Sequence, residues 1–157
     1  MWPNNSVFAS WLEAHADPLM AGRRVLELGT GTGVLYCWLQ RRLGGRLAAL
    51  VCSDAAGDAD IEANVRHNCA RNGVACEFVA HSWGSEWAGP RFDVLLASDV
   101  LLYVHAYPLL VRTLQQLLAR GPAHSPAACV TLRSPLARPS GEPPAELRVP
   151  LPCFVLS

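Results

Sequence analysis

The amino-acid sequence predicts a doubly wound α/β fold, in which helices cover both faces of a mostly parallel sheet. Short apolar runs alternate with amphipathic segments from residue 24 to residue 118. The runs themselves, such as LAALVC at 47–52, lack the polar alternation of a strand that has one face in water. Strands buried on both faces are typical of parallel sheets between two layers of helices. A length of 157 residues suits a single domain over residues 1–157.

The first expected elements are a helix, a strand and a second helix. Residues 6–16 place apolar side chains at helical spacing, and Ser6 is suited to cap the first turn. The run RVLEL at 24–28 stops at glycines and is expected to be a strand. Residues 34–43 carry apolar side chains on one helical face, and two glycines follow that would end the helix.

The pattern of strand and helix then repeats. The run at 47–52 predicts a second strand, and residues 60–72 predict a helix because apolar residues recur at every fourth position before a glycine. Proline is favoured in the first turn of a helix, so a last helix is expected to begin at Pro108 and to close at Gly121. Two further apolar runs are expected to be strands, EFVA at 77–80 and FDVLLAS at 92–98.

The tail from residue 121 onward differs in composition, because it holds eight of the twelve prolines. Proline lacks a backbone donor, so most of this tail cannot form regular structure. Two β-prone runs remain, at 128–132 and 153–156. We expect 153–156 to pair with the strand at 92–98, while the proline-rich stretch 133–148 loops out as an insertion. The alternative is 128–132, which follows its helix at the short spacing usual in α/β folds.

Charge and composition exclude several classes of protein. Thirteen basic residues, all of them Arg, balance thirteen acidic ones, so bulk charge does not predict nucleic-acid binding. No apolar run reaches the roughly 18 residues of a membrane span, and the N-terminus lacks the pattern of a secretory signal. The six cysteines form no CxxC and are expected to be free thiols in a reducing compartment, the cytoplasm or alternatively the nucleus. No spacing suits a metal site, so none is predicted.

The strongest functional signal is the glycine-rich turn ELGTGTG at 27–33, where a strand gives way to a helix. Glycines there allow a positive φ and let the backbone approach a ligand closely. In an open α/β sheet this turn lies at the carboxyl ends of the strands, where ligands bind. A G-x-G-x-x-G fingerprint would need glycine in place of Val34, and a P-loop would need a lysine, which the chain lacks.

Two later positions add to this signal. Asp54 follows the second apolar run, where a carboxylate can accept both hydroxyls of a ribose. Asp58 and Asp60 are the alternatives, although both suit caps of the following helix. Trp83, in HSWG after the third strand, can pack against an adenine ring, or it can simply cover the edge of the sheet.

In combination these segments resemble the seven-strand protein lysine methyltransferases of methyltransferase family 16, which are class I enzymes. The resemblance covers residues 2 to about 118 and is carried by Trp2-Pro3, VLELGTGTG, EANVRHN after Asp54, HSWG and FDVLLASDVLLY. It implies a Rossmann-like class I methyltransferase fold. It also implies S-adenosylmethionine as the cofactor, S-adenosylhomocysteine as its product, and N-methylation of a protein lysine.

The resemblance also implies roles for individual residues. It puts Trp2 beside the cofactor, the glycine turn around its methionine end, Asp54 on the ribose, Trp83 at the adenine and Ser98 beneath the ligand. Asp99 and Tyr103 fall where the family has an Asp-x-x-Tyr/Phe motif at the substrate mouth, and here the spacing is one residue longer. Asp99 would orient the acceptor amine, and Tyr103 would line the channel through which it enters. The full set of implied cofactor contacts is Trp2, Glu27, Gly29, Thr30, Gly31, Asp54, Trp83 and Ser98.

Two other functions compete with protein lysine methylation. Sheets of class I methyltransferases end in a reversed hairpin, which is incomplete in a sequence whose last run is 153–156. An open sheet edge of this kind would need a partner or a second copy to cover it, so the chain could be a cofactor-binding scaffold. The fold also hosts methylation of small molecules and RNA. A protein substrate is expected, with no membrane and no nucleic acid as partner.

Overall fold

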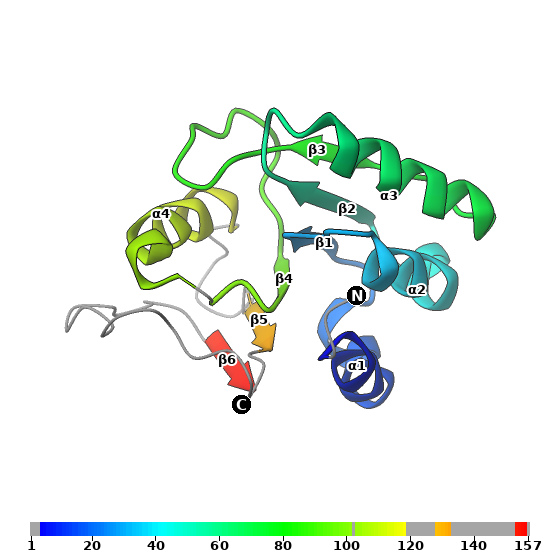
Figure 1. Ribbon diagram of the computed structural model, residues 1–157. Helices are drawn as coiled ribbons and strands as arrows, with labels where there is room; N and C mark the ends of the chain where they lie inside the picture. Colours follow the sequence, from blue (N-terminus) through cyan, green and yellow to red (C-terminus); the bar gives the residue numbers. More distant parts are fainter. Residues whose placement is uncertain (1–3, 102, 119–127, 133–152, 157) are drawn as a thin grey trace.

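The computed structural model describes residues 4–101, 103–118, 128–132 and 153–156 (Figure 1). Helices and strands alternate from residue 4 to residue 80, and short 3₁₀ turns lie at Gly44–Arg46 and Val104–Ala106. The elements are, in chain order, α1 (Asn4–Met20), β1 (Arg24–Leu28), α2 (Val34–Leu43), β2 (Ala49–Asp54), α3 (Ala59–Arg71), β3 (Phe78–Ala80), β4 (Val94–Ser98), α4 (Tyr107–Leu117), β5 (Ala128–Leu132) and β6 (Cys153–Leu156).

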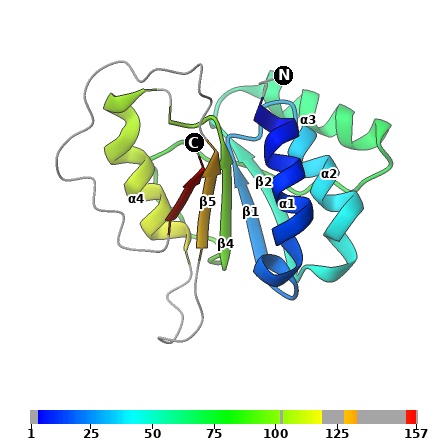
Figure 2. The same ribbon diagram turned by 90° about the horizontal axis from the view of Figure 1, so that it is seen from below.

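The strands form one sheet in the order β3-β2-β1-β4-β5-β6, and every pairing between them is parallel. The chain runs outward from β1 through β2 to β3, then returns to the other side of β1 with β4. This reversal separates the loops that follow β1 and β4, and ligands bind at such switch points. Figure 2 shows α1, α2 and α3 on one face of the sheet and α4 on the other.

Two apolar clusters form the core, one on each face of the sheet. Neighbouring strand residues such as Val25 and Leu26 point to opposite faces, so the strands contribute to both clusters. Buried leucines of α1 and α2 fill the first cluster, and Leu110, Leu114 and Leu117 of α4 fill the second. Each fully buried leucine stabilises the fold by roughly 1.5–3 kcal/mol. The prediction of a doubly wound α/β fold is confirmed.

The sequence places most elements within two residues of their observed positions. β1 and α2 have the predicted bounds, whereas β2 begins two residues later and reaches Asp54. The shift arises because pairing with β1 starts opposite Arg24, at Ala49. α1 begins at Asn4, so Ser6 lies inside the helix and the prediction that it caps the first turn is wrong.

The prediction for the tail is wrong. β5, at 128–132, pairs with β4 over five residues, and β6, at 153–156, pairs with β5 instead. A strand that follows a helix by a short connection returns beside the strand before that helix, and this rule outweighs the apolar character of 153–156. The proline-rich stretch 133–148 lies outside the described residues. Among the helices that the structure describes, none has the length and apolar character needed to cross a membrane.

Candidate functional site

Two of the three glycines in the turn between β1 and α2 have different roles. Gly33 has a φ of 74° and a Cβ added there would lie 3.0 Å from a methyl group of Val65, so close packing of α2 on α3 requires glycine. Gly31 has a φ of 55°, but a Cβ added there would meet nothing within 4 Å. The backbone at Gly31 therefore faces open space, which leaves room for a ligand to approach it.

Asp54 ties this turn to the tip of β2. Its Oδ2 accepts a hydrogen bond from the backbone N–H of Gly31 at 2.8 Å, and its Oδ1 accepts one from Ala55 at 2.8 Å. The backbone N–H of Thr30 also donates to the carbonyl of Ser53 at 3.0 Å. The turn is thus fixed before any ligand binds, which lowers the entropic cost of binding.

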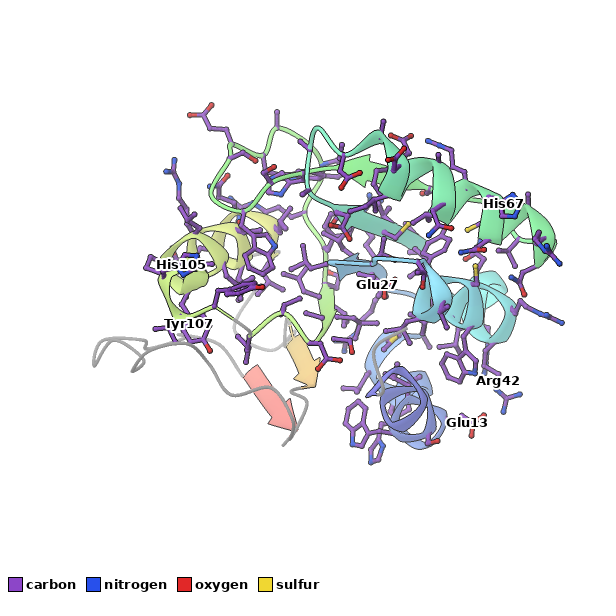
Figure 3. The ribbon with its side chains drawn as sticks, viewed as in Figure 1. Glu13, Glu27, Arg42, His67, His105 and Tyr107 are labelled. Atoms are coloured by element: carbon purple, nitrogen blue, oxygen red, sulfur yellow. The ribbon has the colours of Figure 1, made fainter. Side chains whose placement is uncertain are left out.

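Glu27 is a buried acid beneath the same turn, at the centre of the sheet (Figure 3). Its Oε2 accepts a hydrogen bond from the Thr30 hydroxyl at 2.8 Å. Burial raises the pKa of Glu27 to about 8, and the nearby charge of Asp54 adds to this rise, while the bond from Thr30 opposes it. Near neutral pH the carboxyl group is therefore mostly protonated, and a cation placed beside it would favour its ionised form.

The end of β3 contributes a serine and a histidine. The backbone N–H of His81 donates to the carbonyl of Asp54 at 2.8 Å, and the Ser82 hydroxyl accepts a hydrogen bond from Ala56 at 3.0 Å. The His81 side chain is only 7% exposed, and neither of its ring nitrogens has a hydrogen-bond partner. Its ring meets the ring of Trp87 edge to face at 5.4 Å between centroids. A buried imidazole left unpaired in this way is costly.

Trp83, the predicted adenine contact, is half-buried and packs against the core cluster on the α4 side of the sheet. This contact agrees with a lid over the sheet edge, and contact with an adenine stays a prediction. Gly84 follows it and donates its backbone N–H to the buried hydroxyl of Thr113 at 2.8 Å. The loop that carries Trp83 is thereby attached to α4.

Asp99 follows β4 directly and has a φ of 56°, which makes it the one non-glycine residue with positive φ among the described residues. This left-handed conformation is unfavourable for residues with a Cβ, although Asp and Asn adopt it more readily than the others. Asp99 is also only 5% exposed, and the Ser98 hydroxyl donates to its Oδ2 at 3.4 Å. Strained, buried polar residues of this kind gather at functional sites.

Tyr103, the other residue of the predicted motif, lies on the surface. It is 57% exposed, and its ring lies 5.6 Å from that of His105, which Figure 3 shows beside α4. A hydrogen bond fixes the loop before Tyr103, because the Tyr107 hydroxyl donates to the carbonyl of Leu101 at 3.2 Å. Within the described residues, Tyr103 thus makes its ring contact with His105. That Tyr103 and Asp99 together form the substrate mouth stays a prediction.

The structure brings most of the predicted site residues to one edge of the sheet. Glu27, Thr30, Gly31 and Asp54 are joined by hydrogen bonds. Gly29 starts the same turn, with a φ of 68°, and Ser98 and Asp99 end the neighbouring strand β4. Trp2 lies outside the described residues.

Two residues that support the site were missed. The side-chain amide of Asn68, on α3, donates to the carbonyl of Thr32 at 2.8 Å and so holds the far end of the glycine turn. Ser82 holds the loop after β2, as described above. A sequence signal exists for Ser82, because the carboxyl ends of neighbouring parallel strands meet and polar residues just after them face one another. Asn68 ends EANVRHN, one of the segments that carry the family resemblance, but no pattern points to its partner, 36 residues away.

These residues fit S-adenosylmethionine, which carries a ribose, an adenine and a cationic methionine end. Asp54 can accept hydroxyl groups, and the open backbone at Gly31 leaves room for the methionine end. The protonatable carboxyl of Glu27 lies beneath the same turn, where it can balance a positive charge.

Comparison with known proteins gives relatives of one kind. The chain is 35% identical over 98 residues to EEF1A lysine methyltransferase 3 of Xenopus tropicalis, which covers 61% of this chain and 42% of that protein. It is 27% identical over 139 residues to the protein N-terminal and lysine N-methyltransferase efm7 of Emericella nidulans, covering 76% and 52%. It is 30% identical over 129 residues to the protein-lysine N-methyltransferase EFM3 of Chaetomium thermophilum, covering 74% and 37%. The chain thus spans about half the length of these relatives or less.

Solved structures support the fold alone. Coclaurine N-methyltransferase bound to N-methylheliamine and S-adenosylhomocysteine matches with a TM-score of 0.57 at 14% identity, over 74% of this chain and 33% of that one. TrmN of Thermus thermophilus matches with a TM-score of 0.56 at 24% identity, over 73% and 35%. The sequence model of methyltransferase family 16, described as lysine methyltransferase, matches residues 1–134. The chain therefore belongs to this lysine methyltransferase family.

Proposed function

We propose that the chain is an S-adenosylmethionine-dependent methyltransferase that N-methylates a lysine side chain of a protein. The observation that carries the proposal is the bond between Gly31 and Asp54, which fixes a glycine turn with open backbone at the switch point of a family 16 sheet. The relatives are named as lysine methyltransferases, and this supports the choice of acceptor.

Each residue of the site then has a physical task. S-adenosylmethionine would supply an activated methyl group for an in-line displacement by the amine. Asp54 and the glycine turn would hold it, and such positioning of two reactants is worth roughly 7–11 kcal/mol. The carboxyl of Glu27 would balance positive charge at the methionine end.

The acceptor amine must be neutral to react. An unperturbed lysine has a pKa near 10.4, so its deprotonation at pH 7 costs roughly 4–5 kcal/mol. Asp99, buried and strained after β4, would accept a hydrogen bond from the amine and orient it. Tyr103, exposed beside His105, would line the approach of the substrate. Neither task requires a strong base.

Transfer of a labelled methyl group from S-adenosylmethionine into a protein extract tests the proposal. Mass spectrometry of the labelled protein should locate the methyl group on a lysine side chain. The Emericella relative is named for N-terminal as well as lysine methylation, and label on an α-amine would assign that acceptor instead. Cofactor binding without transfer would favour the scaffold, and label in RNA or in small molecules would overturn the protein substrate.

The proposal also covers the cellular compartment, the partner and the domain organisation of the chain. The described cysteines Cys37, Cys52, Cys69 and Cys76 are free thiols, which supports a reducing compartment such as the cytoplasm. β3 and β6 are the outer strands of the described sheet, and we propose that a partner or a second copy covers the β6 edge. The whole chain, residues 1–157, would form a single cofactor-binding domain.

A further inference from the structure

A groove of about 700 Å³ lies between α2 and α3 and reaches Thr32 of the glycine turn. Its lining includes the apolar side chains of Val34, Cys37 and Trp38, all on one face of α2. Trp38 is only partly buried by the core beneath it, so part of its ring is open to the groove. Large aromatic surfaces that stay accessible are typical of binding sites for other molecules.

Two arginines on the last turn of α2, Arg41 and Arg42, border this apolar floor. Both are exposed, and Figure 3 shows Arg42 extending from α2 away from the sheet. Within the described part of the chain, no acidic side chain pairs with either guanidinium group, whereas Arg66 on α3 pairs with Glu62 at 2.7 Å. The groove lining also contains no acidic residue.

Two asparagines of α3 form the opposite wall of the groove, Asn68 and Asn72. Asn68 donates both side-chain N–H groups, to Thr32 and to Asn64, whereas Asn72 donates one of its two, to the carbonyl of Asn68. Asn68 therefore still has its oxygen as an acceptor, and Asn72 has its oxygen and one N–H. The wall can therefore accept hydrogen bonds from the backbone N–H groups of an extended chain.

We propose that this groove binds a segment of a partner protein in which two acidic residues lie on one side of a bulky apolar residue. The apolar side chain would pack on Trp38 and Val34, and carboxylates would pair with Arg41 and Arg42 in the bidentate way that arginine favours. Complementary charge carries this choice, because an apolar floor with two unpaired cations and no acid repels basic segments. Nucleic acid fits less well, since only two cations border a floor that is otherwise apolar.

The inference does not depend on methyl transfer, and its test is a binding measurement. The full chain would be immobilised and used to select from a displayed library of random 12-residue peptides. Selected peptides are expected to carry Asp or Glu on one side of Leu, Ile, Phe or Trp. Binding of a selected peptide, followed by fluorescence anisotropy, should weaken at least tenfold in Arg41→Glu/Arg42→Glu and in Trp38→Ser.

Arg112→Glu is the matched control, because Arg112 is an exposed arginine on α4, across the sheet from the groove. It should leave peptide affinity within twofold. Thermal melting and S-adenosylmethionine binding, measured for every variant, separate loss of the groove from loss of the fold or of the cofactor site. Selection of basic peptides, no selection above background, equal loss in Arg112→Glu, or tighter binding of a single-stranded oligouridylate would each overturn the proposal.

Discussion

The Oδ2 atom of Asp54 lies 2.8 Å from the backbone nitrogen of Gly31 and accepts its hydrogen bond. This bond joins the tip of β2 to the turn after β1, two places that the chain separates by 23 residues. The carboxylate therefore has two functions in the proposed site: it holds the turn in shape, and it presents acceptor capacity to the ribose. Both depend on its negative charge, because hydrogen bonds to an ionised acceptor are the stronger ones.

Asp54→Ala should weaken binding of S-adenosylmethionine by about 1–3 kcal/mol, the usual cost of leaving hydroxyl and amide partners without an acceptor. Isothermal titration calorimetry would measure the change. Asp60→Ala is the matched control, because Asp60 is an exposed acid in the first turn of α3. Equal affinities of the Asp54 variant and the wild type would remove Asp54 from the site.

Gly31→Arg should abolish cofactor binding while the chain stays folded. An added Cβ at Gly31 meets no protein atom, so the new side chain would fill the space that the ligand needs. Gly22→Arg is a close control, since Gly22 also has a positive φ and open space but lies before β1, at the other end of that strand. It imposes similar backbone strain. If both variants bind the cofactor equally, the turn has no role in binding.

Glu27→Gln should change how stability depends on pH. In the folded chain the pKa of Glu27 is raised from 4.5 to about 8, so between these values the folded state holds a proton that the unfolded state has lost. The contribution of Glu27 is therefore fully present below pH 4.5 and declines, by about 1.4 kcal/mol per pH unit, as pH rises towards 8. Denaturant unfolding from pH 5 to pH 8 should show this decline in the wild type and not in the variant. Parallel pH profiles would contradict the raised pKa.

His81→Leu should stabilise the fold, by about 1–3 kcal/mol, because it replaces a buried imidazole that has no hydrogen-bond partner with an apolar side chain. Thermal and denaturant unfolding without ligand would measure this gain. His67→Leu, on the exposed face of α3, should change stability by less than about 0.5 kcal/mol. A destabilised His81 variant would mean that the imidazole makes a favourable contact beyond its edge-to-face packing on Trp87.

The sequence predicted the fold and the glycine turn because both depend on local patterns. Apolar runs and glycines mark strands and turns directly, and Asp58 caps α3 as its position suggested, its side chain accepting a bond from Ile61 at 3.2 Å. What the sequence could not give were relationships between distant segments. The partner strand of β4 and the bond from Asn68 to Thr32 follow from packing in three dimensions, to which local composition is insensitive. The same holds for the burial of His81 without a hydrogen-bond partner, which no local pattern indicates.

Asp99→Asn should separate cofactor binding from methyl transfer. Asparagine has nearly the same size as aspartate and also tolerates the left-handed backbone that Asp99 adopts, so the fold and the melting temperature should hardly change. It lacks the charge that would orient an acceptor amine and stabilise its developing cation, so the rate of methyl transfer should fall by about tenfold or more, within the range for misplaced reacting groups. The assay would follow label from S-adenosylmethionine into the lysine that the extract experiment identifies, with cofactor affinity measured in parallel. Asp60→Asn is the control, because it makes the same change at an exposed acid in the first turn of α3 and should leave the rate unchanged. Unchanged transfer in Asp99→Asn would remove Asp99 from the catalytic site, and loss of cofactor binding would reassign it to that ligand.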